Sequence, residues 1–159
     1  MSSFQLVGLP AETFAHFPAL SPAALAALGV ARVVADKATG FPCRVSLRDA
    51  DIGDELYLLP YVHQPADSPY KASGPIFVRR NAVAMPLPPG KVPDYVSRRQ
   101  ISLRGYDHRH MMIAAEVCEG HQVAAMLEDL FATDVVEYVH LHNAKRGCYS
   151  CKAQRVVMR

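Results

Sequence analysis

The chain has 159 residues, half of them hydrophobic, and its formal net charge at pH 7 is only +2. This is the usual size of one domain with enough apolar residues to fill a core, so we expect a single domain over residues 1–159. The charge balance lacks the strong basic excess that is typical of nucleic-acid-binding domains, and we expect no nucleic-acid partner.

The apolar segments bear on the cellular location. The first ten residues lack the basic region and the apolar run of a secretory signal. Pro18, Pro22 and Arg32 interrupt the most apolar stretch before it reaches the ~20 residues that a membrane span needs. We therefore expect a soluble cytoplasmic protein without a membrane partner, in which the four cysteines stay free of disulfides.

Two short helices are predicted near the N-terminus. Residues 11–16 follow a proline, and Ser21 with Pro22 supplies an N-cap and a first-turn proline for a second helix that ends at Gly29. Short strands are then expected over residues 32–34, 41–47 and 55–62, with a turn cluster over residues 49–54.

A long loop is expected over residues 63–75, before a strand over residues 76–79. Loops of about a dozen residues without secondary structure are usually functional or disordered, and three prolines favour an ordered one. The proline-rich stretch over residues 85–90 is predicted to be a plain connector.

The C-terminal half is predicted to be mostly strand. Residues 101–106 and 111–117 form a hairpin, and residues 135–142 and 148–157 form two further strands. Between them, Val123, Met126, Leu127 and Leu130 repeat at helical spacing within a helix over residues 120–131. The predicted fold is therefore α+β, a mostly antiparallel sheet with two or three helices packed on it.

The common cofactor and hydrolase motifs are missing from the sequence. There is no Gly-x-Gly-x-x-Gly, no phosphate loop, no His-Glu-x-x-His and no Gly-x-Ser-x-Gly. No cofactor is therefore recognised, and individual reactive side chains have to be weighed.

His140 and His142 are the first such pair. Alternate residues of a strand face the same way, with Cα atoms about 7 Å apart, so the two imidazoles would reach one divalent metal ion. A third ligand would come from His63, Cys43 or Cys148. The alternative is that the histidines form hydrogen bonds at a polar sheet edge.

Cys148 and Cys151 have the spacing of a redox pair, but residues three apart in a strand face opposite sides unless the strand is bulged. Cys148 alone, with His142 and Asn143 close in sequence, has the parts of a thiol nucleophile. The alternative is an inert buried cysteine.

Arginines and loop residues are candidates for binding a ligand. Arginine side chains at turns and in apolar strands often hold carboxylate or phosphate groups, and salt bridges to Asp49, Asp67 or Asp107 are the alternative. Polar residues of the long loop would contact the same ligand, although they also suit ordinary turns. The set comprises Arg44, Arg104, Arg146, Gln64, Asp67, Ser68 and Tyr70.

Four segments carry a family resemblance: residues 39–44, 63–70, 73–78 and 140–149. With them the chain resembles, from about Phe4 to Arg155, the bacterial family catalogued as domain of unknown function 1203. The resemblance implies a small bacterial protein without an established activity, so it assigns no catalytic role. Cys151 does not belong to the family pattern, which further weakens the redox-pair interpretation.

These observations favour a small-molecule enzyme or ligand-binding protein for a small anionic ligand, with metal assistance if the histidines bind an ion. The catalytic candidates are His142, Cys148 and His63, the metal candidates are His140 and His142, and Asn143 joins the ligand-binding set above. The alternative is a non-catalytic binding or protein-interaction domain in which these residues are structural. An exposed strand edge would allow a homo-oligomer in either case.

Overall fold

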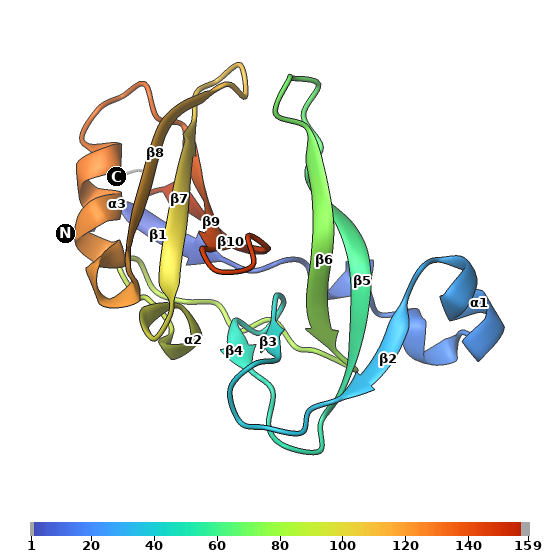
Figure 1. The fold of residues 1–159 in the computed structure, drawn as a ribbon. Helices are drawn as coiled ribbons and strands as arrows, with labels where there is room; N and C mark the ends of the chain where they lie inside the picture. Colours follow the sequence, from blue (N-terminus) through green and yellow to red (C-terminus); the bar gives the residue numbers. More distant parts are fainter. Residues whose placement is uncertain (1, 157–159) are drawn as a thin grey trace.

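The computed structural model describes residues 2–156, whose strands form two five-stranded sheets (Figure 1). The first sheet contains, in sheet order, β1 (Phe4–Val7), β10 (Tyr149–Arg155), β9 (Tyr138–Asn143), β7 (Gln100–Tyr106) and β8 (Met112–Glu119). The second contains β2 (Ala31–Val34), β5 (Glu55–Gln64), β6 (Ala72–Arg79), β3 (Pro42–Cys43) and β4 (Arg48–Asp49). All neighbours are antiparallel except β3 and β6. The predicted α+β class is confirmed, with two sheets instead of one.

The helices are short. They are η1 (Ala11–Thr13), η2 (Phe17–Ala19), α1 (Pro22–Ala27), α2 (Asp94–Ser97), η3 (Gly120–Gln122) and α3 (Val123–Phe131). None of the helices in the described part of the chain is both long enough and apolar enough to cross a membrane.

One face of the first sheet packs against α3 (Figure 1). Val123, Leu127 and Phe131 of α3 are buried against apolar residues of β7 and β9, among them Leu103 and Leu141. Because strand side chains alternate, the residues between these apolar positions face the other way, toward the second sheet. This alternation places the even-numbered residues of β7 and β9 between the two sheets.

The second sheet has a core of its own. Tyr57 of β5 and Ile76 of β6 are buried together with Phe14, Phe17 and Leu25 from the N-terminal helices. The ring of Phe17 meets that of Tyr57 edge-on at a centroid distance of 5.2 Å. The N-terminal helices therefore cover the second sheet, as α3 covers the first.

Helix signals in the sequence were partly confirmed. The Ser21 hydroxyl accepts a hydrogen bond from the amide of Ala24, and Gly29 has a φ of +74°, as the cap pattern predicts for α1. The predicted helix over residues 120–131 is present as η3 followed by α3. The predicted helix over residues 11–16 is instead the 3₁₀ helix η1 followed by a turn, and η2 begins only at Phe17. No pattern predicted β1 or α2.

The predicted strand over residues 41–47 is wrong beyond Cys43. Residues 44–47 form a turn in which the Leu47 amide donates to the Cys43 carbonyl and Leu47 has a φ of +54°. Every residue from Pro42 to Leu47 is buried, so the alternating Cys43, Val45 and Leu47 belong to a buried turn and not to a strand. The turn sends the Arg44 side chain into the interior.

The predicted loop over residues 63–75 is shorter than expected. β5 continues to Gln64 and β6 begins at Ala72, so the two strands form a hairpin with a loop over residues 65–71. The pairing shifts register between Tyr61 and Gln64. The predicted strand over residues 148–157 is observed as β10, and residue 157 lies outside the described residues.

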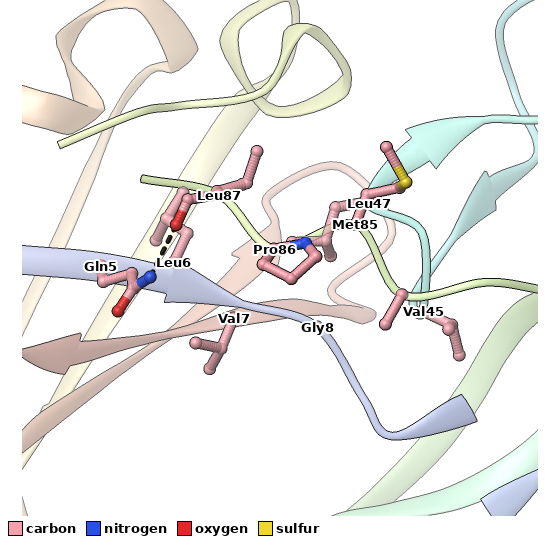
Figure 2. Close-up of a pocket in the computed structure, with 10 residues that line it drawn as sticks. Gln5, Leu6, Val7, Gly8, Val45, Leu47, Met85, Pro86 and Leu87 are labelled. Carbon is pink, nitrogen blue, oxygen red and sulfur yellow. Dashed lines mark hydrogen bonds between the residues drawn. The ribbon is translucent and has the colours of Figure 1, made fainter. Parts of the chain in front are cut away.

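The chain crosses from the first sheet to the second at Gly8 (Figure 2). The Leu9 amide donates to the Arg44 carbonyl at 2.9 Å, and the connector after β6 covers this crossing with a hydrogen bond from Gln5 Nε2 to the Leu87 carbonyl. A Cβ atom on Gly8 would lie 2.6 Å from the Val45 carbonyl oxygen and 3.0 Å from that of Arg44.

We predict that Gly8→Ala lowers the free energy of unfolding by about 3 kcal/mol, because backbone carbonyls cannot move aside for the methyl group. Urea denaturation measures this change. Gly74→Ala is the matched control, since no atom lies within 4 Å of its added Cβ. Equal stability of the two variants would contradict this account of the crossing.

Candidate functional site

Three histidines from the two sheets meet between them. His140 and His142 belong to β9 and His63 to β5, and one ring nitrogen from each lies within 4.8 Å of the other two. His140 is 4% and His142 1% exposed, while His63 is half-buried. The predicted pairing of His140 and His142 on one face is observed, and His63 is the partner that the second sheet contributes.

Local sequence explains this placement on β9. Val139 and Leu141 point into the core beneath α3, so His140 and His142 have to point toward the second sheet. His63 lies within the register shift near the end of β5, opposite this face.

Aromatic rings enclose the histidines. Tyr149 stacks on His63 with centroids 5.5 Å apart and planes 5° from parallel, and it meets His140 edge-on at 5.2 Å. Tyr106 and Tyr138 stack on one another and both lie within 5.3 Å of the His140 ring centroid. These tyrosines restrict the imidazoles and keep water away from them.

Hydrogen bonding fixes one imidazole and leaves two unsatisfied. The Nδ1 atom of His142 lies 2.9 Å from the Gly147 carbonyl. Because a carbonyl only accepts, Nδ1 carries the proton and Nε2 presents a lone pair. The Nδ1 atoms of His63 and His140 are buried without a hydrogen-bond partner among the described residues. Unsatisfied buried nitrogens are costly, which points to a ligand that would complete the cluster.

The environment keeps the imidazoles neutral. Burial, reinforced by His142 and His63, lowers the pKa of His140 to about 3. Burial also lowers the pKa of His142 to about 4, with Arg104 acting in the same direction and the Gly147 hydrogen bond opposing it. The pKa of His63 is lowered by burial and by Arg104. All three rings are therefore neutral at pH 7, and each has a lone pair on one nitrogen.

Arg104 is a cation in direct contact with this cluster. It lies on β7 in register with His140, and its Nη1 is 3.4 Å from Nε2 of His142. Its Nε lies 3.5 Å from the Ser102 hydroxyl, and no carboxylate of the described residues forms a salt bridge with it. A half-buried arginine without an acidic partner is suited to an incoming carboxylate or phosphate.

The predicted ligand-binding residues Gln64, Asp67, Ser68 and Tyr70 differ in how they lie relative to the histidines. Gln64 is buried and donates to the Tyr138 hydroxyl at 3.0 Å, so it supports the aromatic frame. The Ser68 hydroxyl accepts from the Tyr70 amide, Asp67 is exposed, and the Tyr70 ring packs edge-on against Tyr106. Among the described contacts, none joins Asp67 or Ser68 to the histidines, and the contact of Ser68 is ordinary turn chemistry.

A second group of predicted residues surrounds Cys148. Arg44 donates to the Tyr149 carbonyl at 2.7 Å and to the Pro42 carbonyl, and its Nη2 lies 3.4 Å from Cys148 Sγ. The Asn143 amide lies 3.6 Å from the same sulfur. Arg146 is exposed at the rim of this group. The structure thus divides the candidate residues between a histidine cluster and a separate group around Cys148.

The other cysteines lie apart from both groups of reactive atoms. All four cysteines are free; Cys151 is buried in the core beneath α3, whereas Cys148 lines a cleft. The pairing of β10 with β9 shifts register between Tyr149 and Cys151. Cys43 is buried and its sulfur accepts a hydrogen bond from the Arg79 amide.

The sequence did not indicate the three tyrosines that enclose the histidines, Tyr106, Tyr138 and Tyr149. Tyr138 precedes His140 by two residues, and Tyr106 ends a predicted strand. Strand alternation could therefore have predicted that Tyr138 faces the same side of the sheet as His140. No sequence pattern indicated that Tyr149 would stack on a residue of the other sheet.

Acid should destabilise the protein through the buried histidines. The unfolded state takes up protons below pH 6.5, whereas His140 and His142 stay neutral in the folded state until about pH 3 and 4. Stability therefore falls as the pH drops below 6.5. We predict a loss of about 1.4 kcal/mol for each of the two histidines between pH 8 and pH 5.5, measured by urea denaturation. Replacing the exposed His108 with Gln should leave this loss of stability unchanged. A stability that does not change between pH 8 and pH 5.5 would contradict the assignment of His140 and His142 as buried neutral histidines.

A protein-family model described as "Protein of unknown function (DUF1203)" matches residues 40–155, which include the three histidines, Arg104 and Cys148. Comparison with curated proteins and with solved structures gives no significant match. The family match spans well over half of the chain and confirms, over residues 40–155, the resemblance seen in the sequence. The chain therefore belongs to the DUF1203 family.

Proposed function

We propose that this protein binds a divalent transition-metal ion through His63, His140 and His142 and uses it on a small anionic ligand held by Arg104. One observation carries the proposal: three buried or half-buried imidazoles offer nitrogens within 4.8 Å of one another, and two of them have unsatisfied buried nitrogens. Three protein ligands with an open fourth position are the arrangement of catalytic zinc sites.

The chemistry of the donor set suits such an ion. Imidazole nitrogen is a preferred ligand of zinc, copper, iron and nickel, and neutral rings need not lose a proton first. His142 would bind through Nε2, because Gly147 holds its Nδ1 proton in the way that carbonyls commonly orient metal-binding histidines.

Binding requires a modest closure of the rings. A tetrahedral ion with bonds of ~2.1 Å places its ligands about 3.4 Å apart. In the structure the three ring nitrogens are spread over distances of up to 4.8 Å, so the rings would move inward by about an ångström. Half-buried His63, at an irregular part of β5, has the most freedom to do so.

Arg104 would bind the small anionic ligand. Its Nη1 now faces the lone pair of His142 Nε2, the atom that the ion would take. A bound anion would draw the guanidinium to itself and place its acidic group next to the ion. The ion would act as a Lewis acid, and Arg104 would orient the ligand and compensate its charge.

A metal-free ligand-binding role is the second candidate, favoured by the same 3.4 Å contact. In that case Arg104 and the neutral histidines together would bind an anion, and the protein would act as a binding or interaction domain. The two candidates differ in what the removal of histidine or of Arg104 does to metal affinity.

Replacing a ligand should abolish tight metal binding. We predict that His140→Ala and His142→Ala each weaken zinc binding by at least roughly a hundredfold, since two imidazoles hold an ion far less well than three. Competition with a chromophoric chelator measures the affinity, and circular dichroism verifies folding. His108→Ala is the matched control on an exposed turn. Unchanged affinity in a folded His140→Ala variant would refute the site.

Arg104→Gln should act in the opposite direction. It removes a positive charge beside the ligand nitrogen, so we predict severalfold tighter zinc binding in the same competition assay. The variant should also lose the thermal stabilisation that small anions give to the zinc-loaded protein. If Arg104→Gln leaves zinc affinity unchanged while anion binding disappears, the metal-free candidate is favoured.

A further inference from the structure

A cleft of about 840 Å³ opens beside the histidine cluster, and none of the three histidines lines it. Its walls come from the segment before β3, from the end of α2 and from the turn between β9 and β10. The charged side chains that line it are Lys37, Arg44, Arg98, Arg99, Lys145, Arg146 and Glu119. Positive charge is therefore concentrated here, although the whole chain carries only +2.

Most of this positive charge has no acidic partner. Asp49 forms salt bridges with Arg98 and Arg99, at 3.6 and 2.8 Å. The other four cationic side chains, Lys37, Arg44, Lys145 and Arg146, form no salt bridge within residues 2–156. An anion in the cleft would meet a strong local positive potential.

Arg44 is the most constrained of these cations. It is 1% exposed, and its hydrogen-bond acceptors are two backbone carbonyls and the Cys148 sulfur. A buried charge is costly without an opposite charge. An anion bound in the cleft beside Arg44 would supply that opposite charge.

Cys148 lies where it would sense such an anion. Arg44 Nη2 and Asn143 Nδ2 lie 3.4 and 3.6 Å from its sulfur, so an anion bound next to the sulfur would lie next to both donors. Cys148 is partly exposed, whereas Cys43, Cys118 and Cys151 are buried. A thiol reagent that enters the cleft should therefore react mainly with Cys148.

We propose that this cleft is a second ligand site, which binds a small multiply charged anion of the phosphate-ester or diphosphate class beside the Cys148 thiol. Phe41 and Phe77, whose ring centroids lie 5.3 Å apart, give the cleft an apolar wall for the uncharged part of such a molecule. None of the three histidines lines the cleft, so this site does not require the metal site.

The test compares two alkylating reagents of similar size. Iodoacetate is an anion and iodoacetamide is neutral; with either one the Cys148 thiolate forms a sulfur–carbon bond and iodide leaves. The ratio of the two rate constants cancels the thiolate fraction and reports the local potential. We expect the double variant Lys145→Glu, Arg146→Glu to lower this ratio roughly tenfold. Arg109→Glu, on the exposed turn between β7 and β8, should leave the ratio unchanged.

Protection by inorganic pyrophosphate completes the test, with peptide mapping by mass spectrometry to identify Cys148. We expect pyrophosphate to slow both reactions far more than sodium chloride at equal ionic strength. His140→Ala should keep this protection, which separates the cleft from the metal site. An unchanged rate ratio in the folded double variant, or protection no greater than that by sodium chloride, would overturn the proposal.

Discussion

The buried guanidinium of Arg44 holds together the parts on which both candidate sites depend. It reaches from the turn after β3 in the second sheet to the Tyr149 carbonyl in the first, and hydrogen bonds from a charged group contribute about 1.5–3 kcal/mol each. The segment that it fixes, Gly147 to Tyr149, then serves both sites. Gly147 orients the His142 ring, Tyr149 stacks on His63, and Cys148 lines the basic cleft.

This shared segment gives the two sites a physical connection. An anion that drew Arg44 or Cys148 toward the cleft would act on the segment whose Gly147 and Tyr149 orient His142 and His63. The histidine cluster has the neutral lone pairs for a metal ion, and the cleft has the uncompensated cations for a charged ligand. For these reasons we favour the proposed small-molecule function over a purely structural role for these polar residues.

Strand periodicity was sufficient to predict part of this arrangement. It placed His140 and His142 on one face, because that inference needs only the alternation of a single strand. It did not show which of three candidates would join them, since His63 belongs to the other sheet and its position follows from tertiary packing. Apolar Cys43, Val45 and Leu47 alternate with polar Arg44 and Ser46, which is typical of a strand, but residues 44–47 form a buried turn that depends on tertiary contacts. The separation of Cys148 from the histidines likewise depends on packing that no local pattern encodes.

We propose that three imidazoles, and no cysteine, hold an ion between the two sheets. X-ray absorption at the zinc edge of the zinc-loaded protein can identify the ligands, because nitrogen ligands lie at about 2.0–2.1 Å and sulfur ligands at about 2.3 Å. We expect a first shell of nitrogen and oxygen atoms with the outer-shell pattern of three imidazoles. A sulfur shell, or a shell without imidazole scattering, would rule out this metal site.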